Sequence, residues 1–157
     1  MPNWIQACFC AMHYSNKNTA VTMSDLLFMT KKGYCKILII EDDRDIIVTM
    51  KMVLEHKGHI VSDLKNSVGM IELISNNHID IVIMDMFLSD ANGTDICIEL
   101  KKDPSLSHIP LIMMSAYPDA ESICKKAGAD DFISKPFDLD ELLVKVEKFA
   151  GSLPVAE

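Results

Sequence analysis

Short apolar runs alternate with amphipathic segments along the chain from residue 35 onward. Five runs rich in Ile, Leu, Val and Met predict strands over 36–41, 59–63, 79–85, 110–115 and 130–134. Between and after them, apolar residues at helical spacing predict helices over 46–54, 67–75, 93–102, 119–126 and 139–149. Strands and helices that alternate in this way build a parallel sheet, so the pattern predicts an α/β fold, a doubly wound (βα)5 sheet.

The first, third and fourth strands are almost continuously apolar. Strands buried on both faces have this composition, so we expect them at the centre of a flavodoxin-like parallel sheet with strand order 2-1-3-4-5. Asp138 stands just before the last helix and Glu141 follows three residues later, which indicates a capping box.

The chain length of 157 residues and its 49% apolar content suit one globular domain. Residues 1–34 show neither helical nor strand periodicity. We therefore expect an irregular N-terminal leader over 1–34, one domain over 35–151 and a C-terminal tail over 152–157, with no separate output domain in this chain.

Charge and composition narrow the classes of partner. A net charge of -8 and a pI near 5.0 argue against direct nucleic-acid binding, which needs clustered Lys and Arg. No apolar run reaches the roughly 20 residues that cross a bilayer, and the first residues lack the pattern of a secretory signal. Five scattered cysteines suit reduced thiols. We expect a cytoplasmic protein without membrane insertion.

Polar residues with complementary chemistry stand at the ends of four predicted strands. Glu41 and Asp42 follow the first strand, Asp85 ends the third, Ser115 ends the fourth and Lys135 follows the fifth. The carboxyl ends of parallel strands share one edge of a sheet, so these side chains are expected to converge there. Carboxylates gathered in one place repel each other and raise each other's pKa, and a small acidic site of this kind suits Mg²⁺.

The same group of residues predicts phosphoryl transfer to a carboxylate. Asp85 is the expected nucleophile, since a carboxylate can form an acyl phosphate. The ammonium group of Lys135, the hydroxyl of Ser115 and the backbone N–H groups of Met86 and Ala116 are the expected donors to the phosphoryl oxygens.

Four segments closely resemble the receiver domains of two-component response regulators, and the resemblance covers residues 35 to about 150. They are Lys36-Ile-Leu-Ile-Ile-Glu-Asp-Asp43, Asp85-Met-Phe-Leu-Ser-Asp-Ala-Asn-Gly93, Ser115-Ala116 and Gly128-Ala-Asp-Asp-Phe-Ile-Ser-Lys-Pro-Phe137. Four motifs in the right order at four strand ends are far more specific than any one of them. The resemblance implies a signalling domain rather than an enzyme. The only chemistry expected of such a domain is its own Mg²⁺-dependent self-phosphorylation and self-dephosphorylation.

The resemblance also implies roles for individual residues. Asp85 is the phosphoacceptor, Asp42 binds Mg²⁺ directly, Glu41 acts mainly through water, and the backbone carbonyl of Phe87 is a further metal ligand. Lys135 is the essential lysine, Ser115 is the switch hydroxyl, and Phe132 occupies the rotating aromatic position, where the hydroxyl of a Tyr is lost. A second departure is Ser89, where receivers often carry Pro.

The partners implied by the resemblance are a sensor histidine kinase or a histidine phosphotransfer protein as the phosphoryl donor. The downstream protein is expected to bind the face formed by the fourth helix, the fifth strand and the fifth helix. By this resemblance the chain is similar to single-domain regulators of chemotaxis or phosphorelays.

Other interpretations of these residues remain open. Asp43 is as well suited to begin the first helix as to bind metal. Without the resemblance, an aromatic residue at the position of Phe132 is more often a core residue than a switch. A haloacid-dehalogenase-like phosphohydrolase would carry a second Asp at the position of Phe87, and a flavodoxin-like cofactor site would avoid the acidic run that ends at Asp43. Phe87 and Tyr117 flank the site and are predicted to hinder attacking water, which would prolong the phosphorylated state.

Overall fold

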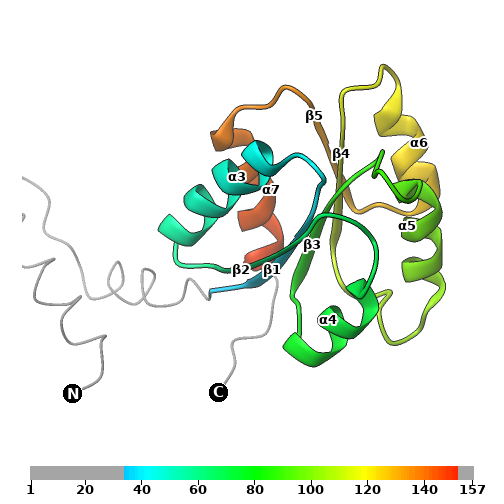
Figure 1. Cartoon of the computed structure of the whole chain (residues 1–157), viewed down its shortest axis with the longest axis horizontal. Helices are drawn as coiled ribbons and strands as arrows, with labels where there is room; N and C mark the ends of the chain where they lie inside the picture. The colour runs from blue at the N-terminus through cyan, green and yellow to red at the C-terminus, as the bar shows by residue number, and fades with distance from the viewer. Residues whose placement is uncertain (1–33, 152–157) are drawn as a thin grey trace, which may run out of the picture. The chain divides into compact units, whose positions relative to one another are not determined.

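The computed structural model describes residues 34–151, which form a five-stranded parallel sheet in the order β2-β1-β3-β4-β5 (Figure 1). The predicted leader, except for its last residue, and the predicted tail lie outside the described residues. The elements in chain order are β1 (Lys36–Ile40), α3 (Arg44–His56), β2 (Ile60–Leu64), α4 (Met70–Asn77), β3 (Ile81–Asp85), α5 (Gly93–Lys102), β4 (Leu111–Ser115), α6 (Ala120–Ala127), β5 (Asp131–Ser134) and α7 (Leu139–Ala150). The predicted fold class and strand order are confirmed.

Two details at the starts of helices differ from the predictions. Helix α4 begins three residues later than expected, because Gly69 just before it has φ of +77°, a left-handed conformation outside the helix. The predicted capping box at Asp138 is wrong: Asp138 precedes α7, but its side chain accepts no hydrogen bond there. Glu141 instead donates its backbone N–H to the carbonyl of Asp138.

The sheet separates two apolar cores. Helices α3 and α7 cover one face and α4, α5 and α6 cover the other (Figure 1). Because neighbouring residues of a strand point to opposite faces, Ile37 and Ile39 of β1 enter the α3–α7 core while Leu38 and Ile40 enter the other. This alternation explains why the central strands are apolar at nearly every position.

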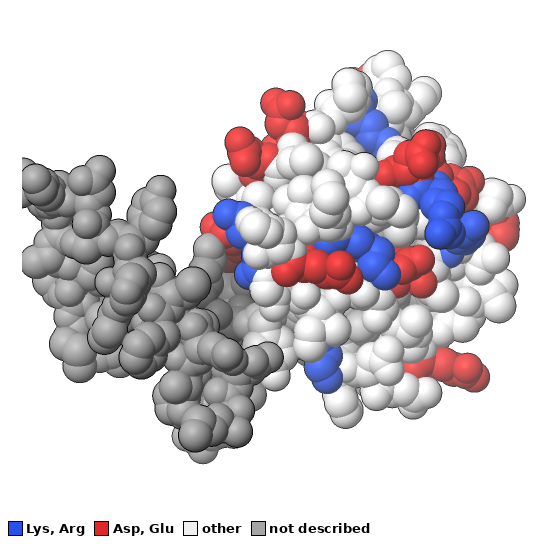
Figure 2. Space-filling model, turned by 60° about the vertical axis from the view of Figure 1, so that its left-hand side comes forward, with Lys and Arg blue, Asp and Glu red and all other residues white. Residues whose placement is uncertain are grey.

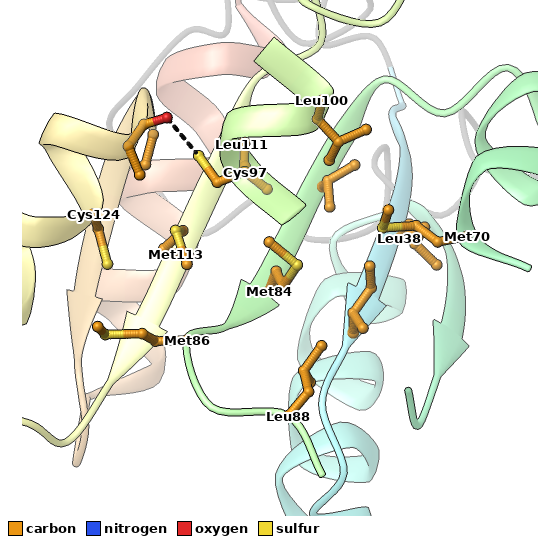
Figure 3. Close-up of a cluster of buried hydrophobic side chains, with 14 of the residues drawn as sticks. Leu38, Met70, Met84, Met86, Leu88, Cys97, Leu100, Leu111, Met113 and Cys124 are labelled. Carbon is orange, nitrogen blue, oxygen red and sulfur yellow. Dashed lines mark hydrogen bonds between the residues drawn. The ribbon is translucent and has the colours of Figure 1, made fainter. Parts of the chain in front are cut away.

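The core under α4, α5 and α6 is rich in sulfur. Figure 3 shows Met84, Met86 and Met113 together with the thiols of Cys97 and Cys124. The thiol of Cys97 donates to the carbonyl of Ala127 at 3.4 Å. Burial is the main cause that raises the pKa of Cys97 to about 11, so this group is a neutral packing residue.

Ion pairs join the last strand to the last helix. Asp131 at the start of β5 contacts Lys145 at 2.9 Å and Lys148 at 2.8 Å, both on α7. Burial alone would raise the pKa of Asp131, but hydrogen bonds from the two lysines outweigh it and hold this pKa at about 2. The charged pairs therefore fix α7 against the edge of the sheet.

Charges of both signs are spread over the surface. In the view of Figure 2, acidic and basic side chains lie in small groups separated by uncharged surface. Among the described helices, none is both long and apolar enough to cross a membrane.

Candidate functional site

The carboxyl edge of the sheet brings together the polar residues that the sequence singled out. Strands β1 and β3 pair with Ile40 opposite Met84, so Glu41 and Asp85 follow at neighbouring positions. On the other side, β3 pairs with β4 next to Ser115, whose carbonyl accepts the backbone N–H of Lys135 at 2.8 Å. The parallel register is therefore what gathers residues from four separate segments at one site.

Lys135 lies between two carboxylates. Its Nζ is 2.5 Å from Oε2 of Glu41 and 3.0 Å from Oδ2 of Asp85. Burial would lower the pKa of Lys135, but the hydrogen bonds and charges of these two partners outweigh it and raise the pKa. The peptide bond between Lys135 and Pro136 is cis. Lys135 is thus a fixed positive charge at the site.

Three carboxylates form a cluster whose geometry suits a metal ion. Glu41, Asp42 and Asp85 each offer one oxygen, and these oxygens lie within 4.8 Å of one another. Glu41 is 1% exposed, and burial is the main cause that raises its pKa, with the charge of Asp85 adding to it. One ammonium group offsets only part of the negative charge, so these hard oxygen ligands fit a small divalent cation such as Mg²⁺.

Asp43 begins a helix. Its side chain accepts hydrogen bonds from the backbone N–H groups of Asp45 and Ile46, at 2.8 and 3.2 Å. This confirms the alternative in which Asp43 starts the first helix, and it is the usual task of an Asp at this position. The backbone N–H of Asp43 donates to Glu41 at 3.2 Å, which helps to hold the acidic pair in place.

The expected phosphoryl-binding role of Met86 is wrong for this structure. Its backbone N–H donates to the carbonyl of Met114 at 2.8 Å, so it continues the ladder between β3 and β4 instead of pointing to the site. The N–H groups of Phe87 and Ala116 have no hydrogen-bond partner within residues 34–151. Strand β3 ends at Asp85 as predicted, but the N–H of the following residue still belongs to the ladder, which apolar composition does not show.

Two residues between Asp85 and α5 that shape the site were not identified from the sequence: Gly93, which packs against Asp85, and Asn92, which begins the helix. The backbone of Gly93 passes so close that an added Cβ would lie 2.4 Å from the carbonyl oxygen of Asp85. Asn92 caps α5 by accepting from the backbone N–H of Thr94 at 3.1 Å and from its hydroxyl at 2.8 Å. An Asn followed by Gly before an amphipathic segment is the signal that could have revealed this cap.

Two exposed aromatic residues flank the site, and a third aromatic residue lies buried in the core. Phe87 and Tyr117 are 53% and 56% exposed, and their rings meet edge to face with centroids 6.3 Å apart. Tyr117 also donates its backbone N–H to the hydroxyl of Ser115 at 3.1 Å. Phe132 is buried in the core under α6, as the packing interpretation predicted, and its role in a switch remains a proposal.

The comparisons with known proteins all point to one protein family. The model of the response regulator receiver domain matches residues 37–147. The nisin biosynthesis regulatory protein NisR of Lactococcus lactis is 34% identical over 114 residues, which cover 71% of this chain and 48% of NisR. The chain thus spans about half the length of this curated relative.

Solved structures with the same fold include receiver domains of histidine kinases. That of a signal transduction histidine kinase from Syntrophus aciditrophicus is 28% identical, with a TM-score of 0.71 and coverage of 78% of this chain and 95% of that one. That of a sensor histidine kinase from Pseudomonas aeruginosa, solved with a coordinated magnesium ion, is 22% identical, with a TM-score of 0.68 and coverage of 76% and 100%. The family model, the relative and the fold agree: this chain belongs to the response regulator receiver family.

Proposed function

We propose that this chain accepts a phosphoryl group on Asp85 from the phosphohistidine of a sensor histidine kinase or a histidine phosphotransfer protein. The observation that carries the proposal is the cluster of three carboxylate oxygens within 4.8 Å of one another, with the Nζ of Lys135 against two of the three side chains. A carboxylate oxygen of Asp85 attacks phosphorus, a new O–P bond forms, and the P–N bond to the donor imidazole breaks. We place this reaction in the cytoplasm, in keeping with the described cysteines, which are all free thiols.

Mg²⁺ fits the acidic side of the site. Asp42 and Asp85 are the proposed direct ligands together with the backbone carbonyl of Phe87, and Glu41 acts mainly through water. When bound, the ion would neutralise charge on the carboxylates and on a transferred phosphoryl oxygen. The Pseudomonas receiver with its coordinated magnesium supports this assignment through the shared fold.

Groups of the chain itself complete the arrangement around phosphorus. Lys135 is held in place by Glu41 and supplies a positive charge beside the oxygen of Asp85. The hydroxyl of Ser115 and the backbone N–H groups of Phe87 and Ala116 are the proposed donors to the other phosphoryl oxygens. The backbone N–H of Phe87 takes the role first expected of Met86, because the N–H of Met86 already donates to the carbonyl of Met114.

Labelling with phosphoramidate and Mg²⁺ tests the phosphoacceptor. Intact-protein mass spectrometry should show one added phosphoryl group that hydroxylamine removes and that Asp85→Asn abolishes. Asp95→Asn is the matched control, because this exposed Asp in the first turn of α5 lies outside the carboxylate cluster. Unchanged labelling of Asp85→Asn, or continuous release of phosphate without a labelled protein, would refute the proposal.

We further propose that phosphorylation signals through the face formed by α6, β5 and α7. Lys135 follows β5 directly, and the same strand carries Phe132 in the core and Asp131 in its ion pairs with α7. A movement at the site can therefore reach this face through one short strand. Beryllofluoride with Mg²⁺ should shift the amide resonances of β5 and α7 in the wild type and not in Asp85→Asn; an unchanged β5 would contradict this output face.

A further inference from the structure

One segment of the chain is free of basic residues. No Lys or Arg occurs from residue 66 to residue 100, a stretch that builds α4, β3 and the first two turns of α5. The same stretch contains six acidic residues: Glu72, Asp80, Asp85, Asp90, Asp95 and Glu99. The Asp, Glu, Lys and Arg residues of this segment are therefore all acidic.

An apolar groove opens between α4 and α5, which this segment largely builds. The cavity has a volume of about 350 Å³, and buried Met70, Leu100 and Leu106 are among its lining residues. Figure 3 shows Met70 and Leu100 at the outer part of the core cluster, on α4 and α5 respectively. Ile96 and Ile71 line it as well, and Ile71 is 48% exposed. Apolar surface is thus open to a partner rather than covered by the chain's described part.

The polar residues that line the groove are held in fixed positions. Asp103 accepts hydrogen bonds from the backbone N–H and the hydroxyl of Ser105, at 2.8 and 2.6 Å. Ser67 donates its hydroxyl to Asp90 at 2.6 Å, which joins the groove to the loop that follows the phosphorylation site. These hydrogen bonds lower the pKa of both carboxyl groups, so both carry a negative charge at neutral pH.

We propose that the groove between α4 and α5 is a docking site for a basic amphipathic helix of another protein. An apolar side chain of that helix enters the cavity between Ile71 and Ile96, and its Lys or Arg side chains pair with Glu99 and Asp103. Apolar anchors in a pocket with charged groups around it are a common mode of helix recognition. Nucleic acids and anionic lipid surfaces are excluded as occupants, because they would meet the same negative charge.

The probe for this site is a labelled synthetic helix of about 18 leucine and lysine residues with one apolar face. Fluorescence anisotropy with the full chain should show saturable binding, and amide resonances of α4 and α5 should shift. Glu99→Lys should weaken the affinity about tenfold, since an attraction becomes a repulsion. Ile71→Ser should weaken it several-fold through the lost apolar contact.

Glu55→Lys is the matched control, because it makes the same charge change at an exposed position on α3, away from the groove. It should leave the affinity unchanged, and a leucine–glutamate helix should not bind. The proposal is overturned if Glu55→Lys weakens binding as much as Glu99→Lys, or if the leucine–lysine helix does not bind at concentrations up to about 1 mM. Asp85→Asn should bind the helix normally, so failure of phosphorylation and failure of docking can be told apart.

Discussion

Replacing Gly93 with Ala tests whether close packing behind Asp85 sets the position of this proposed phosphoacceptor. The added Cβ would lie 2.4 Å from the carbonyl oxygen of Asp85 and 3.1 Å from Cα of Met86. Ordinary contacts of this kind begin at 3.4 Å, so the backbone at the end of β3 must retreat by about 1 Å. Both contacts are backbone atoms, which no side-chain rotation can relieve.

The expected cost can be worked out from these contacts. Overpacking of this kind costs about 1–3 kcal/mol, and strain on the hydrogen bonds from Gly93 to Met86 and from Met86 to Met114 adds about 1 kcal/mol. The better helix propensity of Ala returns at most about 1 kcal/mol. We therefore expect the free energy of unfolding to fall by about 2 kcal/mol, and phosphorylation to slow by about a hundredfold because Asp85 is displaced by about 1 Å.

Urea unfolding and the rate of labelling by phosphoramidate measure the two effects. Gly151→Ala is the control, because its Cβ would meet nothing closer than 3.5 Å and its φ is already helical. That variant should be as stable as the wild type or slightly more stable, with an unchanged labelling rate. If Gly93→Ala matches the wild type in both measurements, the packing argument is wrong.

Three further predictions follow from charge and exposure at other positions. The pKa of Asp131 is about 2 in the folded state and near 3.8 when unfolded. Its carboxylate therefore stabilises the fold by up to about 2 kcal/mol above pH 4, and this contribution is lost as the pH falls toward 2. Urea unfolding should show that Asp131→Asn is less stable than the wild type at pH 7 and that the difference in the free energy of unfolding is smaller at pH 3. Mg²⁺ at about 100 times its dissociation constant should stabilise the wild type by about 2.7 kcal/mol, and differential scanning fluorimetry should show that Asp42→Asn loses most of this gain. Replacing Phe87 with Asn and Tyr117 with Ala should shorten the half-life of the phosphorylated state several-fold by admitting water, and an unchanged rate of phosphate release would disprove the shielding.

The architecture was predictable because periodicity and topology constrain it strongly. Apolar residues at nearly every position of β1, β3 and β4 fit only strands covered on both faces, and helical spacing between them leaves a parallel sheet as the solution. Once the strand order is known, the meeting of Asp85, Glu41 and Lys135 follows, since the carboxyl ends of β1, β3 and β5 lie at one edge. The composition of the strands and their order in the sheet were sufficient to predict this part of the site.

The details that could not be predicted depend on individual backbone groups. The N–H of Met86 is bonded across the sheet and that of Phe87 is not, a difference of one residue that no side-chain pattern encodes. The late start of α4 depends on the positive φ of Gly69, and the absent cap at Asp138 depends on a side-chain orientation. In each case a local hydrogen bond or dihedral angle decided the outcome, and several arrangements were compatible with the sequence.

The carboxylate cluster around Asp85 and the ion pairs of Asp131 have opposite electrostatic characters. Away from the cluster, the half-buried side chain of Asp131 contacts two lysines, has a depressed pKa and favours folding in its charged form. At the site, the pKa of Glu41 is raised, so its charged form opposes folding even with Lys135 in contact. Two apolar cores on either side of the sheet supply stability that the cluster itself does not. A cation or a phosphoryl group at the cluster would change the charge where carboxylates already repel one another, so we expect the carboxylate cluster, rather than the apolar cores, to respond to either ligand.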